Sequence, residues 1–457
     1  MPIQNLAAVI LAAGKGTRMQ SECPKVLHPI AGKPLAAYPL RLAQELGCSS
    51  TVMVVGHESE RVRQAFTGNN VVFVEQQQQL GTGHALQVAQ AGLADFSGTI
   101  LLLCGDVPLL RRQTLEKMLH DHANAQADVS VLTSIVDNPQ GYGRVVRSGS
   151  EVERIVEEKD ASIKEREIKE INTGIYAFAA PLAFELIQQL SNNNAQGEYY
   201  LTDIIALARL RGGKVVAATL GDASEAMGIN DRVQLAQAGK ILRARINHAH
   251  MVAGVTLIDP DTTYIDDGVV IGADTTIYPG AHVRGNTTIG NNCTIETGVV
   301  IDNCTIADHS YIKASSALED SALGEHSTVG PMAHLRPGTV LCGNNKIGNF
   351  VETKKSIIGE RSQASHLTYI GDAELGRDVN LGCGTITCNY DGVNKHKTII
   401  EDGVFVGSDT QFIAPVTIGR NSLIGAGSTI TKDVPADALA LSRSEQRIIA
   451  GWRKRKD

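Results

Sequence analysis

Five residues in the last third of the sequence have types and spacings that suit acid–base chemistry on a phosphorylated substrate. Arg336 and Lys354 lie eighteen residues apart, and His366 and Tyr369 follow. Two cations can hold a phosphate, and an imidazole that titrates near neutral pH can accept a proton from an amine. The set predicts a phosphate pocket with His366 as general base and Glu352 orienting its ring, although a lone histidine is usually a structural residue.

A second set of candidate residues follows an apolar run near the start of the chain. The loop Leu11–Met19 is rich in small residues, and Arg18 and Lys25 add positive charge. Small side chains let backbone N–H groups approach a phosphate or a base. The loop has neither the ending of a Walker A motif nor the GxGxxG spacing. Taken alone it is a weak signal, which a plain connection could also give.

The stretch Ile265–Val434 carries an aliphatic residue at every sixth position, with a few one-residue contractions. A period of six fits neither a helix nor a plain strand. It fits a parallel β-helix of roughly nine coils, about eighteen residues each, whose aliphatic side chains point inward. Such a coil would stack Arg336 and Lys354 on one side. The polar loop Asn389–Lys397 interrupts the array, and we expect it to project from a binding face unless it is only a tolerated insertion.

Residues 1–230 alternate apolar strands with helices, which indicates an α/β domain with a mainly parallel sheet and ligands at the carboxyl ends of its strands. The predicted strands are Leu6–Leu11, Thr51–Val55, Val71–Val74, Thr99–Leu103 and Val129–Ile135, and the predicted helices are Leu35–Leu46, Glu58–Phe66, His84–Gly92 and Gln113–Ala125. A connecting helix is expected over Arg232–Arg245, ending near two surface histidines, His248 and His250. Its predicted apolar stripe is Val233, Leu235, Ala236, Ile241 and Leu242.

The composition argues against several classes of function. A formal net charge of −7 disfavours a nucleic-acid partner. No apolar stretch approaches the length of a membrane span, and no signal peptide pattern opens the chain. The eight cysteines show no zinc-site spacing, so we expect reduced, small core residues. These features predict a cytoplasmic protein with no membrane span and a solvated basic tail at Arg453–Lys456.

The sequence LAAGKGTRM, followed by Pro24 and Lys25, resembles the signature of the sugar-nucleotide pyrophosphorylases. Further segments match this family in the family's order: Gln76–Gly83, Leu102–Pro108, Gly141–Arg144, Glu157–Asp160, Asn172–Gly174 and Gly228–Asn230. Together with the hexapeptide array, nearly the whole chain resembles a bacterial family of bifunctional enzymes. The resemblance implies a Rossmann-like α/β nucleotidyltransferase domain followed by a left-handed parallel β-helix.

Two consecutive reactions are implied by this resemblance. Glucosamine 1-phosphate is acetylated by acetyl-CoA in the β-helix, and N-acetylglucosamine 1-phosphate then takes UMP from UTP in the α/β domain, releasing pyrophosphate. The product would be a precursor of peptidoglycan and lipopolysaccharide. Family members form homotrimers, and the resemblance implies the same here.

The resemblance also assigns residues to the nucleotide site. Asp106 and Asn230 would offer Mg²⁺ the oxygen ligands that it prefers, and Gln76 could read the base through a donor and an acceptor. Ordinary turn or surface residues are the alternative for these positions. Cys104 departs from the tyrosine expected in the family. The implied ligands of UTP and the nucleotide sugar are Leu11, Ala12, Ala13, Gly14, Arg18, Lys25, Gln76, Gly81, Thr82, Gly141, Glu157, Asn172 and Asn230.

In the β-helix, the resemblance places glucosamine 1-phosphate against Arg336, Lys354, Tyr369, Asn380 and Lys395. His366 would take the proton of the attacking amine. Cys383 stands where the family usually has alanine. The implied acetyl-CoA ligands are Cys383, Asn389, Tyr390, Ser408, Ala426 and Arg443.

The sequence therefore predicts four segments: a nucleotidyltransferase domain at 1–230, a connecting helix at 231–250, a β-helix acetyltransferase domain at 251–437 and a tail at 438–457. Two other interpretations compete with a bifunctional enzyme. One is a monofunctional nucleotidyltransferase whose β-helix regulates or oligomerises, and the other is a β-helix scaffold beside an inactive α/β domain. The segment His366–Tyr369 with Asn389–Lys397 argues against the former, and Lys25 with Asp106 against the latter.

Overall fold

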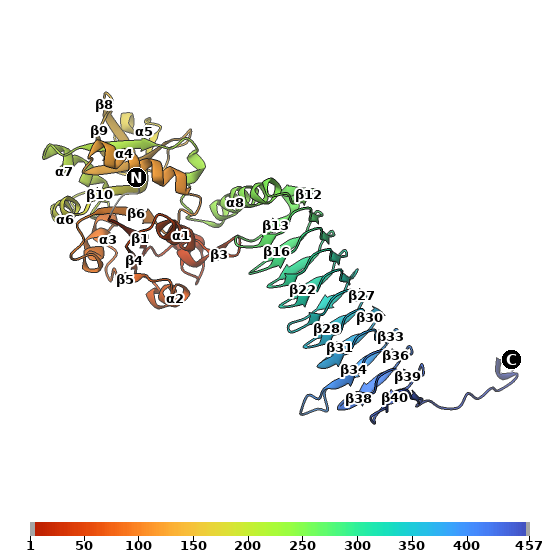
Figure 1. The fold of residues 1–457 in the computed structure, drawn as a ribbon. Coiled ribbons are helices and arrows are strands. Elements are labelled where there is room, and N and C mark those ends of the chain that lie inside the picture. The colour runs from red at the N-terminus through yellow and green to blue at the C-terminus, as the bar shows by residue number, and fades with distance from the viewer. Residues whose placement is uncertain (1–4, 454–457) are drawn as a thin grey trace. The chain divides into compact units, whose positions relative to one another are not determined.

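The structure is a computed structural model that describes residues 5–453 and forms two compact units, Met1–Leu242 and Arg243–Asp457 (Figure 1). The boundary between the units falls inside a single helix, α8 (Arg232–Val252). The four predicted segment limits stay predictions. Each unit is described by itself below.

The first unit is built on a sheet of mostly parallel strands. Its order is β11 (Val215–Thr219), β7 (Val129–Ile135), β10 (Glu170–Ala179), β6 (Thr99–Cys104), β1 (Leu6–Ala12), β4 (Ser50–Val55) and β5 (Val72–Glu75). β10 runs antiparallel to both of its neighbours and also pairs with the hairpin of β8 (Arg144–Ser148) and β9 (Glu151–Val156). A small separate hairpin joins β2 (Pro29–Ile30) and β3 (Lys33–Pro34). The predicted mainly parallel sheet is confirmed.

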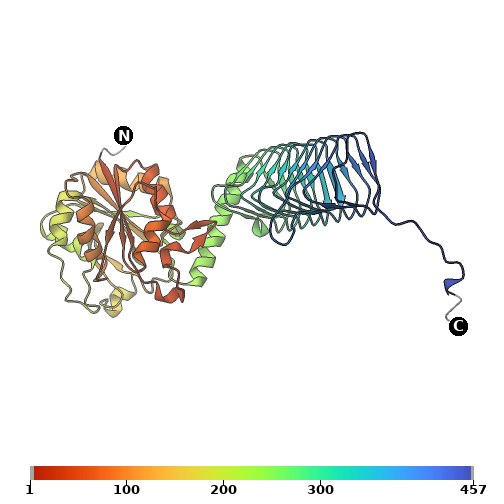
Figure 2. The same ribbon diagram turned by 90° about the horizontal axis from the view of Figure 1, so that it is seen from below.

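Helices cover both faces of this sheet (Figure 2). Buried aliphatic residues of α3 (Thr82–Ala89), α6 (Ala180–Ile187) and α7 (Ile204–Leu210) pack on one face. Those of α1 (Ala37–Glu45), α2 (Ser59–Ala65) and α4 (Arg112–Ala125) pack on the other, and α5 (Ile163–Arg166) is a short surface helix. Short 3-10 turns lie at Thr17–Met19, Lys25–Leu27, Gln90–Gly92, Leu201–Asp203, Ala223–Ala226 and Pro260–Thr262. The central strands are therefore buried on both sides, as their continuous apolar sequences indicate.

The second unit is a left-handed parallel β-helix with three faces. The first face contains β12 (Thr256–Leu257), β15 (Thr276–Ile277), β18 (Thr294–Ile295), β21 (Tyr311–Ile312), β24 (Thr328–Val329), β27 (Lys346–Asn349), β30 (Gln363–His366), β33 (Asn380–Leu381), β36 (Phe405–Val406), β39 (Leu423–Ile424) and β41 (Leu439–Ala440). The second contains β13 (Tyr264–Ile265), β16 (His282–Arg284), β19 (Val300–Asp302), β22 (Ala317–Glu319), β25 (His334–Leu335), β28 (Glu352–Lys354), β31 (Tyr369–Gly371), β34 (Ile386–Cys388), β37 (Gln411–Ile413) and β40 (Thr429–Ile430). The third contains β14 (Val270–Ile271), β17 (Thr288–Ile289), β20 (Thr305–Ile306), β23 (Ala322–Leu323), β26 (Val340–Leu341), β29 (Ile357–Ile358), β32 (Ala373–Leu375), β35 (Thr398–Ile400) and β38 (Val416–Ile418).

The residues that carry the six-residue period form one continuous core inside these faces. The faces have 11, 10 and 9 strands, which agrees with the predicted number of coils. Contractions in the sequence period shorten a coil by one residue: Thr288 pairs with Thr305, whereas His334 pairs with Glu352. The loop 389–397 leaves the coil between β34 and β35, as predicted.

Some details of the predictions are wrong. The connecting helix α8 begins at Arg232 as predicted and ends two residues after His250, but Val233 and Ala236 are exposed rather than part of an apolar stripe. In the first turn of α8, Arg232 forms polar contacts with Met19 and His28. All eight cysteines are free, but Cys342 is exposed and so is not a core residue. Of the helices that the structure describes, none is long and apolar enough to cross a membrane.

Candidate functional sites

A cavity of about 330 Å³ opens at the carboxyl ends of β1 and β6 in the first unit. β1 ends at Ala12, and the small residues that follow leave the backbone open to the cavity. Nine of the predicted ligands line it: Leu11, Ala12, Ala13, Gly14, Lys25, Gln76, Gly81, Thr82 and Asp106. The sheet therefore brings the loop after β1 together with Asp106, ninety-five residues after Leu11 in the sequence.

Three polar side chains meet at this cavity. The Lys25 Nζ lies 2.5 Å from Asp106 Oδ2 and 3.2 Å from Asn230 Oδ1. Lys25 and Asp106 are mostly buried, with 13% and 21% of their side chains exposed. One carboxylate oxygen and one amide oxygen thus converge on a single cation, the pair that was predicted to hold Mg²⁺. The geometry of the set is compatible with that prediction.

Arg232, in the first turn of α8, holds the loops beside Lys25. Its Nε donates to Met19 O at 3.3 Å, and its Nη1 lies 3.3 Å from the Nδ1 of the buried His28. Burial and the neighbouring guanidinium both lower the pKa of His28, so the imidazole is neutral and accepts at Nδ1. Because Asn230 lies two residues before Arg232, α8 fixes both the amide and the loop that faces it.

Gln76 is buried, and its amide Nε2 donates to Gly81 O at 3.0 Å. The neighbouring Gln79 donates to Ala13 O at 2.7 Å, which ties this loop to the glycine-rich loop after β1. Gly81 starts α3 with a φ of +104°, and a Cβ there would meet Tyr199 O at 2.7 Å. Gly81 is therefore required by both conformation and space.

Five predicted residues are not among the described residues that line the cavity: Arg18, Gly141, Glu157, Asn172 and Asn230. Asn230 nevertheless contacts Lys25, which does line it. Arg18 is exposed. The Gly141 N–H donates to Glu158 Oε2 at 3.3 Å, and the fully buried Arg144 also donates to that carboxylate at 2.6 Å. The structure thus uses Gly141 in a surface network rather than in the cavity.

Glu157 is half-buried and accepts a hydrogen bond from Thr202 Oγ1 at 3.1 Å. Burial raises the pKa of its carboxyl, and the nearby Asp203 and Asp160 add to that effect. The Asn172 Oδ1 accepts from Gly174 N at 3.0 Å and from the Tyr176 hydroxyl at 2.9 Å. Asn172 is thereby fixed within β10, and Glu157 is held by the 3-10 turn Leu201–Asp203.

Cys104 lines the cavity at the end of β6, and its Sγ lies 3.5 Å from Gly174 O. Burial raises the pKa of the thiol to about 12, with Asp106 adding to the shift, so the side chain is a neutral thiol. It occupies the position where the family's tyrosine was expected. Because it lines the cavity and also contacts Gly174, the cavity lies next to the Asn172–Gly174 turn. Two polar lining residues, Gln79 and Glu198, were not predicted as ligands. The position of Gln79 in a polar run at a strand end was a usable signal.

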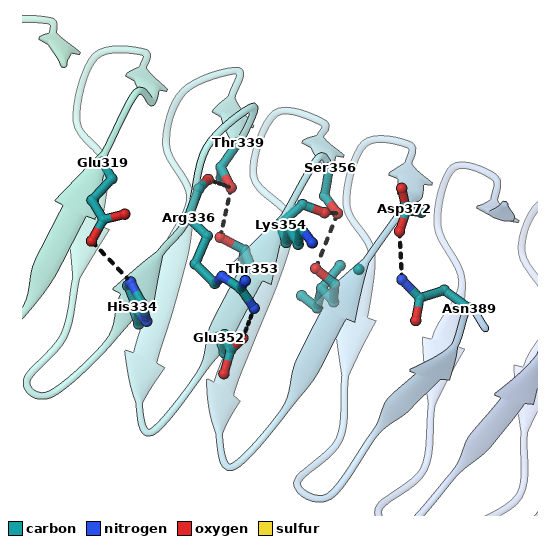
Figure 3. A network of polar contacts seen from close by, with 12 residues as sticks. Glu319, His334, Arg336, Thr339, Glu352, Thr353, Lys354, Ser356, Asp372 and Asn389 are labelled. Carbon is teal, nitrogen blue, oxygen red and sulfur yellow. Dashed lines mark hydrogen bonds and ion pairs between the residues drawn. The ribbon is translucent and has the colours of Figure 1, made fainter. Parts of the chain in front are cut away.

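In the β-helix, the second face carries two of the predicted phosphate ligands, Arg336 and Lys354 (Figure 3). β25 and β28 pair with Leu335 opposite Thr353, which sets Arg336 beside Lys354 as the spacing predicts. Lys395, from the loop after β34, is close enough to lower the pKa of Lys354, and Arg336 lowers it further. Three cations thus gather where the resemblance implies a phosphate.

Tyr369 lies on the same face, on β31, level with Glu352. Its ring extends over Gly371, because a Cβ at Gly371 would meet the Tyr369 hydroxyl at 2.4 Å. The register also sets Gly371 beside Lys354. The absence of a side chain at Gly371 therefore makes room for the phenol near the cations, a contribution that sequence reasoning missed.

The expectation that Glu352 orients His366 is wrong in this structure. The Glu352 Oε1 accepts from Arg336 Nη1 at 2.7 Å, as Figure 3 shows. His366 instead contacts Asn349, with Nδ1 and Oδ1 2.8 Å apart. Glu352 points along its own face toward the nearest cation, whereas His366 ends a strand of the first face, where Asn349 is its register partner.

Three predicted acetyl-CoA ligands continue the column of side chains that contains His366. The pairing of β30, β33, β36 and β39 sets Cys383 level with His366, then Ser408 and Ala426 in the following coils. Arg443 donates from Nη1 to Ala426 O at 2.9 Å, so the chain beyond β41 returns to this column.

Other predicted ligands lie elsewhere in the single chain. Asn380 is on the first face, level with Gln363 and not with His366. Asn389 is buried and donates to Asp372 Oδ2 at 2.5 Å, and the exposed Tyr390 donates to Gly392 O at 2.6 Å within the projecting loop. The chain by itself does not bring these three residues to the His366 column.

Comparisons with known proteins agree with this two-part architecture. Residues 8–191 match the MobA-like NTP transferase domain, residues 265–351 match the GMPPB C-terminal domain, and residues 397–432 match the bacterial transferase hexapeptide family. The fold and the matches define a nucleotidyltransferase joined to a hexapeptide-repeat acyltransferase.

Curated relatives extend over the whole chain. The bifunctional protein GlmU of Syntrophotalea carbinolica is 63% identical and aligns with 100% of this chain and 98% of its own. GlmU of Pelobacter propionicus and of Geobacter sulfurreducens are 57% and 56% identical, each covering 99% of both chains. The chain belongs to the bifunctional GlmU family, which combines a uridylyltransferase with a glucosamine-1-phosphate acetyltransferase. The predicted bifunctional enzyme is thereby confirmed over the two alternatives, with nucleotide and acyl-CoA substrates.

Proposed function

We propose that the cavity at β1 and β6 binds UTP and N-acetylglucosamine 1-phosphate, with Lys25 and the open backbone of Leu11–Gly14 facing the phosphates. A sugar phosphate oxygen attacks the α-phosphorus of UTP, and the bond to pyrophosphate breaks. This transfer needs no protein nucleophile, so the protein's task is to position both partners and to neutralise charge. The convergence of Lys25, Asp106 and Asn230 on the cavity is the observation that carries this proposal.

Asp106 and Asn230 fit the role of Mg²⁺ ligands. Their oxygens are hard donors and already converge on one cation, the ammonium group of Lys25. Two protein oxygens leave the other coordination positions to phosphate and water, the usual arrangement for this ion. When bound, Mg²⁺ supplies charge neutralisation on the phosphates. Lys25 would then be released toward a phosphate.

The sugar would contact Gly141, Glu157 and Asn172, and Arg18 would contact the phosphates. Support comes from Cys104, which both lines the cavity and contacts Gly174, two residues from Asn172. The Asn172 Oδ1 is occupied by two hydrogen bonds, so its amide N–H groups are the ones free to reach a sugar hydroxyl. Gln76 would read the uracil edge through its carbonyl oxygen, because its amide nitrogen already contacts Gly81 O and His84 Nδ1.

For acetyl transfer, Arg336, Lys354 and Lys395 would hold the phosphate of glucosamine 1-phosphate, with Tyr369 beside them. The amine attacks the thioester carbonyl of acetyl-CoA, its proton passes to Nε2 of His366, and the bond to the CoA sulfur breaks. The column of Cys383, Ser408 and Ala426 that continues from His366 gives acetyl-CoA a path along the β-helix, with Arg443 at its end.

The assembly would be a cytoplasmic homotrimer. Asn380, Asn389 and Tyr390 lie apart from the His366 column in the single chain, so a neighbouring copy could complete the site. The α/β domain at 1–230, helix at 231–250, β-helix at 251–437 and tail at 438–457 are proposed as its segments. Light scattering of the purified protein tests the stoichiometry, and a monomer with full acetyltransferase activity would contradict it.

The proposal as a whole is tested by incubating the protein with glucosamine 1-phosphate, acetyl-CoA, UTP and Mg²⁺ and identifying the products by mass. UDP-N-acetylglucosamine is expected, and omission of acetyl-CoA should leave glucosamine 1-phosphate unconsumed. If omission of Mg²⁺ with a chelator present left uridylyl transfer unchanged, the proposed metal site would be contradicted.

A further inference from the structure

We propose that Asn349 is a positioning residue for acetyl transfer, which fixes the tautomer and orientation of the His366 imidazole. This inference rests on the proposed role of His366 as general base. The Asn349 Oδ1 lies 2.8 Å from the His366 Nδ1. An amide oxygen can only accept, so Nδ1 carries the hydrogen and the Nε2 lone pair stays free for the amine proton.

The β-helix holds this pair in register. β27 and β30 are parallel neighbours that pair Asn349 with His366. Each residue is followed by one in the left-handed region, Phe350 with φ 58° and Leu367 with φ 43°. Both strands therefore turn the corner at the same point, and Leu367 N donates to Asn349 O at 3.1 Å across the turn. The two side chains leave the backbone side by side.

The groups around His366 leave Asn349 as its orienting partner. Lys346 is the one charged residue on β27, β30 and β33, and it lies at the far end of β27 from Asn349. Cys383 follows His366 in the column, and on the adjacent face Glu352 is paired with Arg336. Among the described residues, no carboxylate forms an ion pair with the ring. A neutral amide thus sets the tautomer without placing a charge beside the ring, and the Nε2 lone pair is left to accept the amine proton.

The test compares Asn349→Asp and Asn349→Ala in the full-length protein. A carboxylate beside Nδ1 keeps the tautomer but favours the imidazolium ion, so the acid limb of the kcat/KM profile for acetyl transfer should move up by about one pH unit. Activity at pH 9 should stay within about threefold of wild type. Asn349→Ala should lower kcat by about tenfold or more with little change in the KM for glucosamine 1-phosphate.

Asn344→Asp is the matched control, because it adds the same charge at an exposed asparagine five residues earlier on the β-helix. It should leave the profile unchanged, and uridylyl transfer should be normal in every variant. If Asn349→Asp and wild type have superimposable profiles while His366→Ala is inactive, the role of Asn349 is overturned and the proposed base stands. Substantial acetyl transfer by His366→Ala would instead overturn the proposed base itself.

A spectroscopic measurement covers the case in which Asn349→Ala does not fold. In protein labelled with ¹⁵N-histidine, neutral His366 should show a protonated Nδ1 and an unprotonated Nε2, with His366→Gln used to assign the signals. The opposite tautomer in the wild-type protein would overturn the inference.

Discussion

At the residue scale, Lys25 links the parts of the nucleotide site, since it contacts Asp106 from the turn after β6 and Asn230 from the segment before α8. An ammonium group between two oxygens offsets the charge of the carboxylate while the ligand is absent. The same two oxygens suit a divalent cation once phosphates supply the missing negative charge. The nucleotide site is thus arranged around positive charge at one point of the sheet edge.

Asp106→Asn should lower uridylyl transfer by about a hundredfold or more, because the variant loses the anionic ligand and the partner of Lys25. Acetyl transfer should be normal in the same preparation. Pyrophosphate release measured over a range of Mg²⁺ concentrations checks this. Unchanged UTP turnover at low Mg²⁺ would contradict the assignment.

Glu157 makes the stability of the first unit depend on pH. Burial holds the pKa of its carboxyl above the usual value, so the folded state binds this proton more tightly than the unfolded state does. The contribution is favourable at low pH and is lost as pH rises through the usual glutamate range to the raised folded pKa. Glu157→Gln does not titrate, so its melting temperature relative to wild type should increase between pH 4 and pH 7, by about 1–3 °C.

Thermal melts of both proteins at several pH values measure this difference, and Glu153→Gln is a control at an exposed position of the adjacent strand β9. A difference that is constant with pH, or one that falls as pH rises, would show that the carboxyl is not held at a raised pKa.

At the element scale, β31 illustrates how a strand of two or three residues can shape a site. Tyr369 and Gly371 both face outward on it, so the missing side chain of one leaves space for the ring of the other. The neighbouring strand β28 then brings Lys354 to the same place. In the α/β unit, Gly81 likewise leaves space that a side chain would fill, because a Cβ there would meet Tyr199 O just before α3.

Gly371→Ala should displace the Tyr369 hydroxyl without unfolding the β-helix, since the clash involves the far end of a movable side chain. We expect the KM for glucosamine 1-phosphate to rise about tenfold, a loss of roughly 1.4 kcal/mol of binding. Tyr369→Phe is the companion variant: if both changes act through the hydroxyl, the double variant should be no worse than the more impaired single one. Fully additive losses would show that Gly371 acts in another way.

The extent to which sequence predicts this molecule also differs by element. The six-residue period located the core of every coil, because burial in a β-helix depends only on alternation and spacing. It also set Arg336 beside Lys354. It did not identify the partner of His366, since an eighteen-residue coil was assumed and the contraction that aligns Asn349 with His366 is one residue shorter. Glu352 was expected to orient the His366 ring. The repeat predicts which residues stack in neighbouring coils, but it does not predict which neighbour a side chain such as Glu352 contacts.

At the scale of the whole molecule, two separate cores divide the chain. One lies between the α/β sheet and its helices, and the other runs along the β-helix. The boundary between compact units at Leu242 lies twelve residues beyond the predicted end of the first domain, inside α8. This boundary falls inside the predicted connecting helix, and its exact residue has no signal in the sequence because the helix has a single continuous pattern.

A fragment of residues 1–230 should still convert N-acetylglucosamine 1-phosphate and UTP to the nucleotide sugar, because its core is self-contained. A fragment of residues 1–242 should melt at a higher temperature, by about 2–5 °C, since it keeps the contacts of Arg232 with Met19 and His28. Calorimetry and the pyrophosphate assay compare the two. Equal melting temperatures would show that the Arg232 contacts of α8 do not stabilise the first unit. A folded 1–242 fragment without activity would contradict the independence of the first domain.

The most direct test of the central claim, that two separate sites catalyse the two reactions, is to assay both half-reactions of His366→Ala between pH 6 and pH 9. Loss of a general base should slow acetyl transfer by about 10²–10⁴-fold, while uridylyl transfer by the same protein stays at the wild-type rate. Near-normal acetyl transfer across this pH range, or an equal loss of both activities, would contradict the account.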